Sequence, residues 1–173
     1  MRPAVQPTGV ERFWAEEEII VSKTDLKGII TYANEVFQRV SGYTEEELIG
    51  QNHNIIRHPD MPRAVFKLLW DTLHAKQEIF AYVVNLARNG DCYWVHAHVT
   101  PTFGPDGEMI GYHSSRRVPE RSAVEKAKGL YAVLLAEERK HSDWREGMQA
   151  AGTLLGSLLS DMKVDYDEFV FSL

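Results

Sequence analysis

Cysteine, long apolar runs and excess positive charge are all scarce in this chain, and each scarcity excludes a class of protein. Cys92 is the single cysteine among 173 residues, which excludes an internal disulfide framework and fits a reducing compartment. No apolar run approaches the roughly 20 residues that span a bilayer, and the N-terminal residues form no signal-peptide core. The formal net charge of −6 argues against general binding of nucleic acid. We therefore expect a cytoplasmic protein that binds no nucleic acid and does not insert directly into a membrane.

Sequence motifs of catalysis and of metal binding are also missing. The chain contains no nucleophile elbow, P-loop or kinase signature, so we expect no enzymatic activity. His96 and His98 lie two residues apart on one face of an expected strand and could bind one metal ion. No CxxC or HExxH motif supports such a site, and alternating histidines on a strand are more often surface residues. We therefore predict no metal site.

The chain does contain the pattern of a mixed helix and sheet domain. Hydrophobic residues make up 44% of the chain and charged residues 25%, an ordinary soluble profile. Two strands are predicted near the N-terminus and three after the longer helix that ends near residue 74, with a type I′ turn at Asn89-Gly90. The expected strands are residues 19–22, 28–32, 79–88, 92–101 and 109–117.

Caps and apolar periodicity mark the helices around these strands. Asn34 is a predicted helix N-cap, and Thr44 opens a capping box. A longer helix over residues 62–74 is apolar around well over half of its circumference, so it packs on two sides or walls a ligand site. Residues 10–18 predict a short N-terminal helix, and residues 123–140 predict a C-terminal one.

The order of these elements predicts an α+β fold with one five-stranded antiparallel sheet, short helices on one face, and flanking N- and C-terminal helices. We divide the chain into an N-terminal arm and helical cap (1–18), a central domain (19–118) and a C-terminal helical extension (119–173). The extension contains an amphipathic segment whose Gly152 and Gly156 weaken an isolated helix by about 1 kcal/mol each. We therefore expect it to dock on the core or form a dimer interface, ahead of contacting a partner protein.

Four stretches of the sequence resemble a known family. They are TDLKGIITYANEVFQRVSGYTEEELIGQ, HNIIRHPDMP, the helix ending LLWDTL, and NGDCYWVHAHVTP followed by GYHSSRR. Together they cover about residues 19–118 and resemble a PAS domain. The combination of HNIIRHPDMP with the downstream LLWDTL points to a narrower group within this family, because it is similar to PAS domains of the bacterial aerotaxis receptor (Aer) type. Because the chain carries no transmembrane or methyl-accepting region, it looks more like the stand-alone, CetB-like PAS proteins of energy taxis.

This resemblance implies a redox or energy sensor. PAS domains of this type bind flavin adenine dinucleotide (FAD) non-covalently, and the stand-alone proteins act with a membrane-bound methyl-accepting transducer or other signalling protein. It implies a homodimer or hetero-complex in the cytoplasm, recruited to membrane receptor arrays. The alternatives are a haem-binding PAS gas sensor with His53 as the axial ligand, and a ligand-free PAS dimerisation module. A covalent flavin photosensor is disfavoured, because NHNIIRH replaces the segment that carries the reactive cysteine of light-oxygen-voltage domains.

Six residues are candidates for contacts with the cofactor, and three lie outside the HNIIRHPDMP stretch. Asn34 could pair with the flavin ring or merely cap its helix. Asn85 shares an apolar strand face with Val83 and Ala87, and a buried amide there needs a polar ligand or water as partner. Trp70 could stack on the flavin or the adenine, or pack in the core.

The other three candidates lie within that stretch. Arg57 presents a planar fork suited to phosphate oxygens, and His53 and His58 could add hydrogen bonds to phosphate, ribose or adenine. A polar loop in which Arg57 pairs with Asp60 is the alternative, and the resemblance of the whole stretch favours the cofactor.

A signal from the cofactor is expected to leave through the sheet. We expect reduction of the flavin to shift Asn85 or Asn34 and so to alter the packing of the sheet. The outer face with Trp94, His96 and His113 is then a candidate partner surface, unless a terminal helix covers it.

Overall fold

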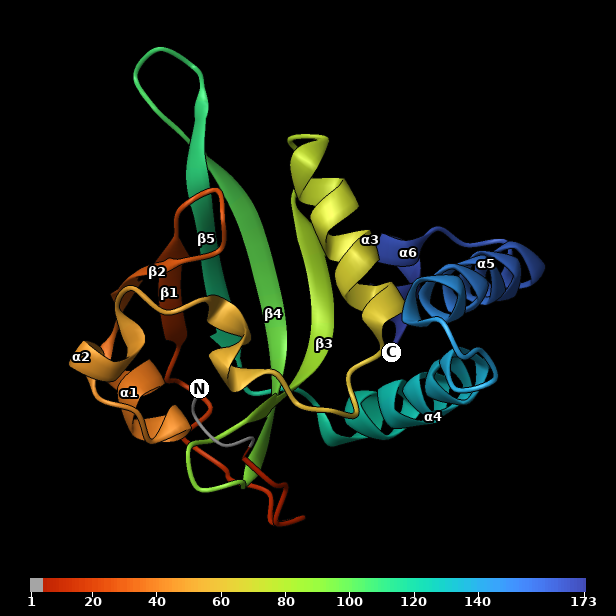
Figure 1. Ribbon diagram of the computed structural model, residues 1–173, viewed down its shortest axis with the longest axis horizontal. Helices are drawn as coiled ribbons and strands as arrows, with labels where there is room; N and C mark the ends of the chain where they lie inside the picture. The colour runs from red at the N-terminus through yellow and green to blue at the C-terminus, as the bar shows by residue number, and fades with distance from the viewer. Residues whose placement is uncertain (1–4) are drawn as a thin grey trace.

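A single antiparallel sheet with strand order β2-β1-β5-β4-β3 organises the chain (Figure 1). The computed structural model describes residues 5–173. The strands are β1 (Ile20–Thr24), β2 (Ile30–Ala33), β3 (Ile79–Leu86), β4 (Cys92–Phe103) and β5 (Met109–Arg117). The predicted α+β fold with a five-stranded antiparallel sheet is therefore confirmed.

The register of the central strands decides which side chains share a face. In the pairing of β1 with β5, Ser22 lies opposite Ser114, and Arg116 lies two residues further along β5. In the pairing of β3 with β4, Val83 lies opposite Val95 and is followed two residues later by Asn85. Because side chains alternate along a strand, each of these series stays on one face of the sheet.

Helices cover the face of the sheet that carries Asn85 and Arg116. They are α1 (Glu35–Ser41), α2 (Glu45–Leu48), the 3₁₀ turn η1 (His53–Ile56) and the longer α3 (Arg63–His74). Asn34 caps α1, as predicted, by accepting the Phe37 N–H. The predicted capping box of Thr44 and Glu47 is also present. These caps satisfy backbone N–H groups that a short helix otherwise leaves unpaired.

The turn between β3 and β4 differs from the predicted type I′. That turn needs a positive φ at both central residues, but Asn89 has none, and Gly90 has a φ of 95°. The loop is longer, over residues 87–91, and is closed by a 2.7 Å hydrogen bond from the Ala87 N–H to the Asp91 carbonyl. The Asp91 carboxylate in turn accepts from Arg12 Nε at 3.0 Å, so the N-terminal segment holds the longer loop in place.

The predicted helix over residues 10–18 is wrong, because this segment runs without helix along the start of β4. The Arg12 N–H donates to the Cys92 carbonyl at 2.7 Å, and Glu11 forms an isolated parallel bridge with Cys92. Trp14 packs edge-on against Tyr93, with ring centroids 6.1 Å apart. Pairing with the sheet thus replaces the hydrogen bonds that a helix would have made within the segment.

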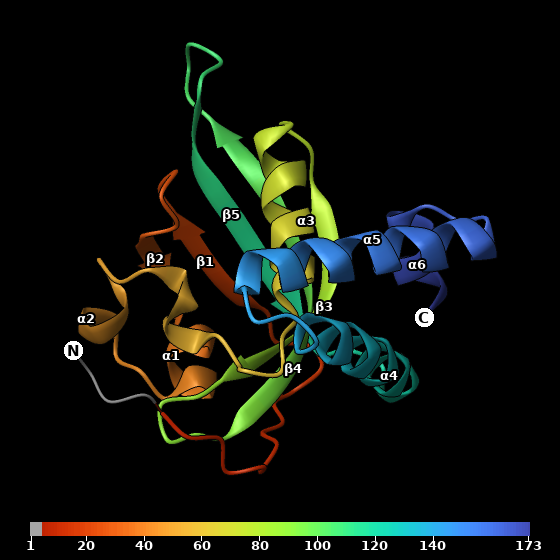
Figure 2. The ribbon, with the colours of Figure 1, turned by 45° about the vertical axis from the view of Figure 1, so that its right-hand side comes forward.

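Three C-terminal helices pack around the β3 edge of the sheet (Figure 2). They are α4 (Arg121–Glu138), α5 (Trp144–Met162) and α6 (Tyr166–Ser172). The α4 residue Tyr131 donates to the Tyr82 carbonyl at 2.5 Å and stacks on Trp94, while α5 packs on α3. The α6 residue Phe171 contacts Phe80 and the ring of His96. The extension therefore docks on the core, one of the two arrangements that the sequence predicts.

This docking corrects part of the proposed partner surface. Trp94 is 6% exposed and lies under α4, so it is not available to a partner in this conformation. His96 is half-buried beside α6. None of the helices within residues 5–173 is long and apolar enough to cross a membrane.

Candidate cofactor-binding site

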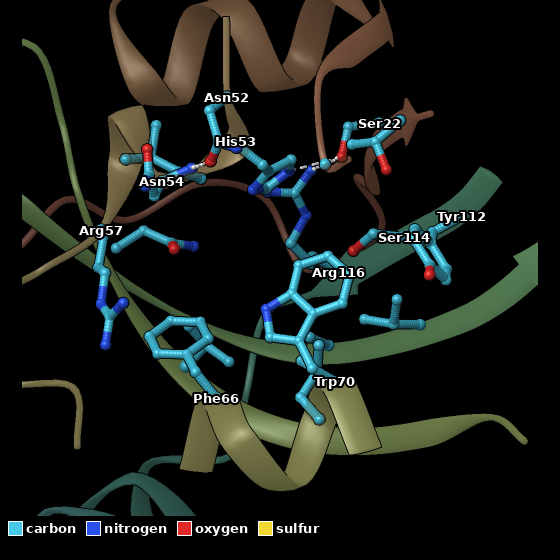
Figure 3. Close-up of a pocket in the computed structure, with 18 of the residues that line it drawn as sticks. Ser22, Asn52, His53, Asn54, Arg57, Phe66, Trp70, Tyr112, Ser114 and Arg116 are labelled. Atoms are coloured by element: carbon cyan, nitrogen blue, oxygen red, sulfur yellow. Dashed lines mark hydrogen bonds between the residues drawn. The ribbon is translucent and has the colours of Figure 1, made fainter. Parts of the chain in front are cut away.

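A cavity of about 400 Å³ lies between the covered face of the sheet and the segment that contains η1 and α3 (Figure 3). Its size falls within the range of small-molecule sites, and most of its wall is apolar. The α3 helix contributes one side and the strands contribute the other. The apolar lining residues are Ile56, Phe66, Leu69, Trp70, Val83, Ala97, Val99 and Tyr112.

Trp70 forms the aromatic part of the α3 wall. Its ring meets Tyr112 of β5 in an edge-to-face contact, with centroids 5.3 Å apart and planes at 75°. A Cβ added to Gly28 would lie 3.5 Å from the indole, so the β1–β2 turn closes on the same ring. The indole therefore has a fixed place in the cavity wall, which suits stacking against a planar ligand.

Arg116 is a buried cation within the cavity wall. Its side chain comes from β5, the residue is 2% exposed, and Nη2 donates to Ser22 Oγ at 2.6 Å. Its Nε and Nη1 atoms are buried without a hydrogen-bond partner. Burial lowers the pKa of Arg116 to about 10, which still leaves the guanidinium charged at neutral pH. The guanidinium also lies over the ring of Phe37, 4.5 Å from its centroid.

His53 completes a short chain of hydrogen bonds with these residues. Ser22 Oγ lies 2.9 Å from His53 Nε2. Because Ser22 accepts from Arg116, its own hydroxyl hydrogen is free to donate to Nε2, an arrangement in which His53 carries its proton on Nδ1. Burial and the nearby charge of Arg116 lower the pKa of His53 to about 3, so the imidazole is neutral.

Asn85 lines the cavity from β3. The residue is 5% exposed, and its Nδ2 atom is buried without a partner. The sequence-based expectation that Asn85 faces the core is confirmed. With Arg116, it gives the cavity three unpaired polar nitrogens. Buried donors are normally paired, so these atoms point to a ligand or water molecules that accept hydrogen bonds.

Arg57 lies at the exposed mouth of the cavity. Its guanidinium stacks over Phe66, 4.2 Å from the ring centroid, instead of forming the ion pair with Asp60 that the sequence offered as an alternative. Burial, followed by the charge of Arg63, lowers the pKa of Arg57, and the charge of Glu138 raises it. Lys27, Asn52 and Asn54 line the cavity as well.

Two of the six candidates are placed elsewhere. Asn34 Oδ1 accepts the N–H groups of Val21 and Phe37, and its Nδ2 donates to the Ile19 carbonyl, so the amide holds β1 to α1. His58 is 6% exposed, and its Nδ1 accepts the Asp60 N–H in the turn before α3. Neither residue lies among those that line the cavity.

The metal-binding and cysteine-based alternatives that were considered from the sequence have little support in the geometry of the described residues. No group of three or more histidine, cysteine or acidic residues within the described part of the chain is arranged to hold a metal ion. His96 and His98 instead contact Phe80 on the outer face of the sheet. Cys92 lies at the start of β4, where burial raises the pKa of its thiol, and it does not line the cavity.

Comparison with known proteins identifies the fold family. A family model described as the PAS fold matches residues 30–116, which is half of the chain. The chain belongs to the PAS family. A solved PAS domain from Colwellia psychrerythraea has the same fold, with a TM-score of 0.54 and 22% identity over 58% of this chain and 86% of that one.

Two curated relatives share the PAS domain at higher identity. The aerotaxis receptor of Escherichia coli is 42% identical over 70% of this chain and 24% of its own length. The nitrogen fixation regulatory protein of Klebsiella pneumoniae is 33% identical over 59% of this chain and 21% of its own length. The chain therefore spans about a quarter or less of these relatives, and what it shares with them is a PAS sensor domain.

Sequence reasoning missed Arg116, Ser22 and Ser114 as lining residues of this PAS cavity. A signal for Arg116 was present, because Tyr112, Ser114 and Arg116 alternate along one expected strand and so share a face. An arginine on the same face as a tyrosine is ambiguous until the partner strands show whether that face is buried.

Proposed function

We propose that the chain is a non-catalytic redox sensor that binds FAD non-covalently in the PAS cavity. The observation that supports this most is the set of unpaired buried nitrogens on Asn85 and Arg116 beneath an aromatic wall. A flavin presents carbonyl oxygens and ring nitrogens that accept hydrogen bonds, and a flat ring that fills an apolar slot. Bound FAD would supply reversible oxidation and reduction, and the protein would supply binding and orientation.

The residues of the cavity divide into three roles in this proposal. Asn85 and Arg116 donate hydrogen bonds to the polar edge of the flavin ring. Trp70 and Phe66 pack against its faces or against the adenine. Arg57, at the mouth, contacts the pyrophosphate, for which its planar guanidinium is suited. Ser22 and His53 hold Arg116 in place and take no part in the chemistry.

The proposed output is protein contact with a signalling partner. A 42% identical relative is named an aerotaxis receptor, which supports a role in energy taxis. We propose that the protein acts in the cytoplasm as a homodimer or hetero-complex, and that it passes the redox state of FAD to a membrane-bound methyl-accepting transducer or another signalling protein. Recruitment to membrane receptor arrays follows from that partner.

A haem or a ligand-free cavity explains the geometry less well. His53 directs Nε2 to Ser22, so an iron would have to displace this hydrogen bond. A ligand-free module would leave the charge of Arg116 buried beside a hydroxyl as its hydrogen-bond partner, which is costly. A ligand-free module would also leave the donors of Asn85 and Arg116 unused.

The absorption spectrum of the purified protein tests the proposal directly. We expect flavin bands, and FAD as the compound released on denaturation. Titration of the flavin-free protein with FAD and with riboflavin should show tighter binding of FAD, and Arg57→Ala should reduce that difference. Arg88→Ala is a matched control, because Arg88 pairs with Glu47 outside the cavity. A colourless folded protein that does not take up FAD, or a Soret band, would sink the proposal.

A further inference from the structure

The first turn of α3 lacks a cap from its own segment. Its N-cap residue is Pro62, which makes no side-chain hydrogen bond to the helix. Helices leave their first backbone N–H groups without a partner inside the helix, and a side chain at the N-cap normally accepts one of them. The α3 helix supplies Phe66, Leu69 and Trp70 to the cavity, so the position of its first turn affects the cofactor site.

Glu138, 74 residues further along the chain than Ala64, supplies the missing cap. It is the last residue of α4, and its Oε1 accepts the Ala64 N–H at 3.0 Å. Its Oε2 lies 3.7 Å from Arg63 Nη1, and only 4% of the Glu138 side chain is exposed. A buried carboxylate at a helix N-terminus is stabilised by the helix dipole and by direct hydrogen bonds.

The junction between α4 and α5 lies beside the start of α3 (Figure 2). A Cβ added to Gly147, in the first turns of α5, would lie 2.5 Å from the Glu138 carbonyl oxygen. The α5 helix also packs against α3. The start of α3, the end of α4 and the start of α5 therefore meet at Glu138, and none of them can shift without disturbing its contacts.

We infer that Glu138 is a positioning residue that couples the cofactor cavity to the C-terminal helices. Its carboxylate fixes the first turn of α3, and so the side chains that α3 presents to a ligand, to the α4–α5 junction. Coupling of this kind is reciprocal. A ligand that orders α3 therefore also stabilises the α4–α5 junction, and loosening that junction weakens binding of the ligand. This inference rests on the proposed binding of FAD for its ligand, and it gives the site an output route through helices as well as through the sheet.

The charges around Glu138 add an electrostatic part to this coupling. Arg57 and Arg63 are both close enough to interact with Glu138, and Arg57 lies at the cavity mouth. A glutamine at position 138 would keep an acceptor for the Ala64 N–H and remove one negative charge near that mouth. An alanine would remove both. The two variants therefore separate the hydrogen bond from the charge.

The test compares Glu138→Ala and Glu138→Gln with Glu137→Ala. Glu137 is a matched control, since it is the adjacent residue on α4 and pairs with Lys140 and His141 instead of α3. Titration of flavin-free protein should show FAD binding about fivefold weaker in Glu138→Ala, the scale of one lost cap. Glu138→Gln should restore binding to within about twofold of wild type, because the acceptor remains and the mouth becomes less negative.

Hydrogen exchange supplies the readout that a general loss of stability would not give. FAD should slow amide exchange over residues 139–147 in the wild type and in Glu137→Ala, and should not do so in Glu138→Ala. Equal FAD affinity in the two alanine variants, or equal protection of residues 139–147 by FAD, overturns the inference. If Glu138→Ala does not fold, the same comparison is made with Glu138→Gln and a Glu138→Lys variant, and weak binding by Glu138→Gln overturns the capping role.

Failure of the proposed function gives a different result. A wild-type protein that does not bind FAD removes both the function and the coupling to this ligand. In the flavin-free protein, exchange over the first turn of α3 still reports on Glu138 alone, and Glu138→Ala should accelerate it relative to Glu137→Ala. Unchanged exchange there overturns the positioning role even if the protein binds FAD.

Discussion

Arg116 donates to the Ser22 hydroxyl across 2.6 Å, so a cation that is 2% exposed has a neutral group as its hydrogen-bond partner. A buried charge is costly unless it is paired and fully hydrogen-bonded. Two further nitrogens of the same guanidinium are unpaired, and the side chain lines the cavity. This arrangement is explained if the missing partner is a ligand, and it makes Arg116 a binding residue at some cost to the stability of the empty protein.

Replacement of Arg116 should therefore separate stability from binding. We expect Arg116→Met to raise the free energy of unfolding of the flavin-free protein by about 1–3 kcal/mol, because it removes unsatisfied buried donors. The same variant should bind FAD about 10- to 100-fold more weakly, since it loses hydrogen bonds from a charged group. Urea unfolding and FAD titration measure the two effects. A destabilised variant with unchanged FAD affinity would assign Arg116 to the core instead.

The two asparagines predicted from the sequence should behave in opposite ways. Asn34→Ala removes an amide that makes three hydrogen bonds to the backbone, so we expect it to lower the free energy of unfolding by about 1–3 kcal/mol. FAD affinity of the folded Asn34 variant should be unchanged. Asn85→Ala should leave stability nearly unchanged, because its amide nitrogen has no protein partner, and should weaken FAD binding. Weaker binding in the Asn34 variant alone would reverse this assignment.

The contrast between these asparagines shows which features can be predicted from the sequence alone. The cap at Asn34 and the capping box at Thr44 depend on neighbours within a few residues, so local pattern is enough to place them. The inward direction of Asn85 follows from alternation along a single strand. These local rules also predict the five strands and the helix that becomes α3.

Contacts between distant segments could not be predicted from the sequence. The segment around Arg12 satisfies its backbone on β4, some 80 residues later, and this pairing overrides its helical pattern. The sequence pattern around Glu138 is that of an ordinary surface acid on an amphipathic helix. Only folding brings Glu138 to the start of α3. The burial of Arg116 likewise depends on the strands and helices that surround β5. Long-range packing decides each of these cases.

Trp70 and Trp94 form a second matched pair, on opposite faces of the sheet. We expect Trp70→Leu to weaken FAD binding about three- to tenfold, since stacking contributes roughly 0.5–1.5 kcal/mol beyond simple burial. The fluorescence of bound flavin should also rise in this variant, as the indole no longer lies beside the cavity. Trp94→Leu changes a residue that packs under Tyr131 of α4, so it should lower stability and leave FAD affinity unchanged. Equal effects of the two variants on binding would remove Trp70 from the site.

His53 gives the flavin-free protein a specific dependence on pH. Its pKa is lowered in the folded state to about 3 from an ordinary value of 6.5, because burial and Arg116 disfavour the charged imidazole. The unfolded chain therefore binds the extra proton first as the pH falls. The contribution of neutral His53 to stability is fully present above pH 6.5 and is lost progressively as the pH falls from 6.5 towards 3.

Replacement of His53 by glutamine isolates this effect from the other histidines. The pKa values of His58, His96 and His113 are also lowered, but these residues remain in the variant and their contribution cancels in the comparison. Between pH 7.5 and pH 5, the wild type should lose up to about 2 kcal/mol more unfolding free energy than His53→Gln, at about 1.4 kcal/mol per pH unit below the ordinary pKa. Urea unfolding of both proteins at the two pH values measures this difference. An equal loss in both would mean that His53 titrates normally in the folded protein, and that its imidazole is not held neutral beside Arg116.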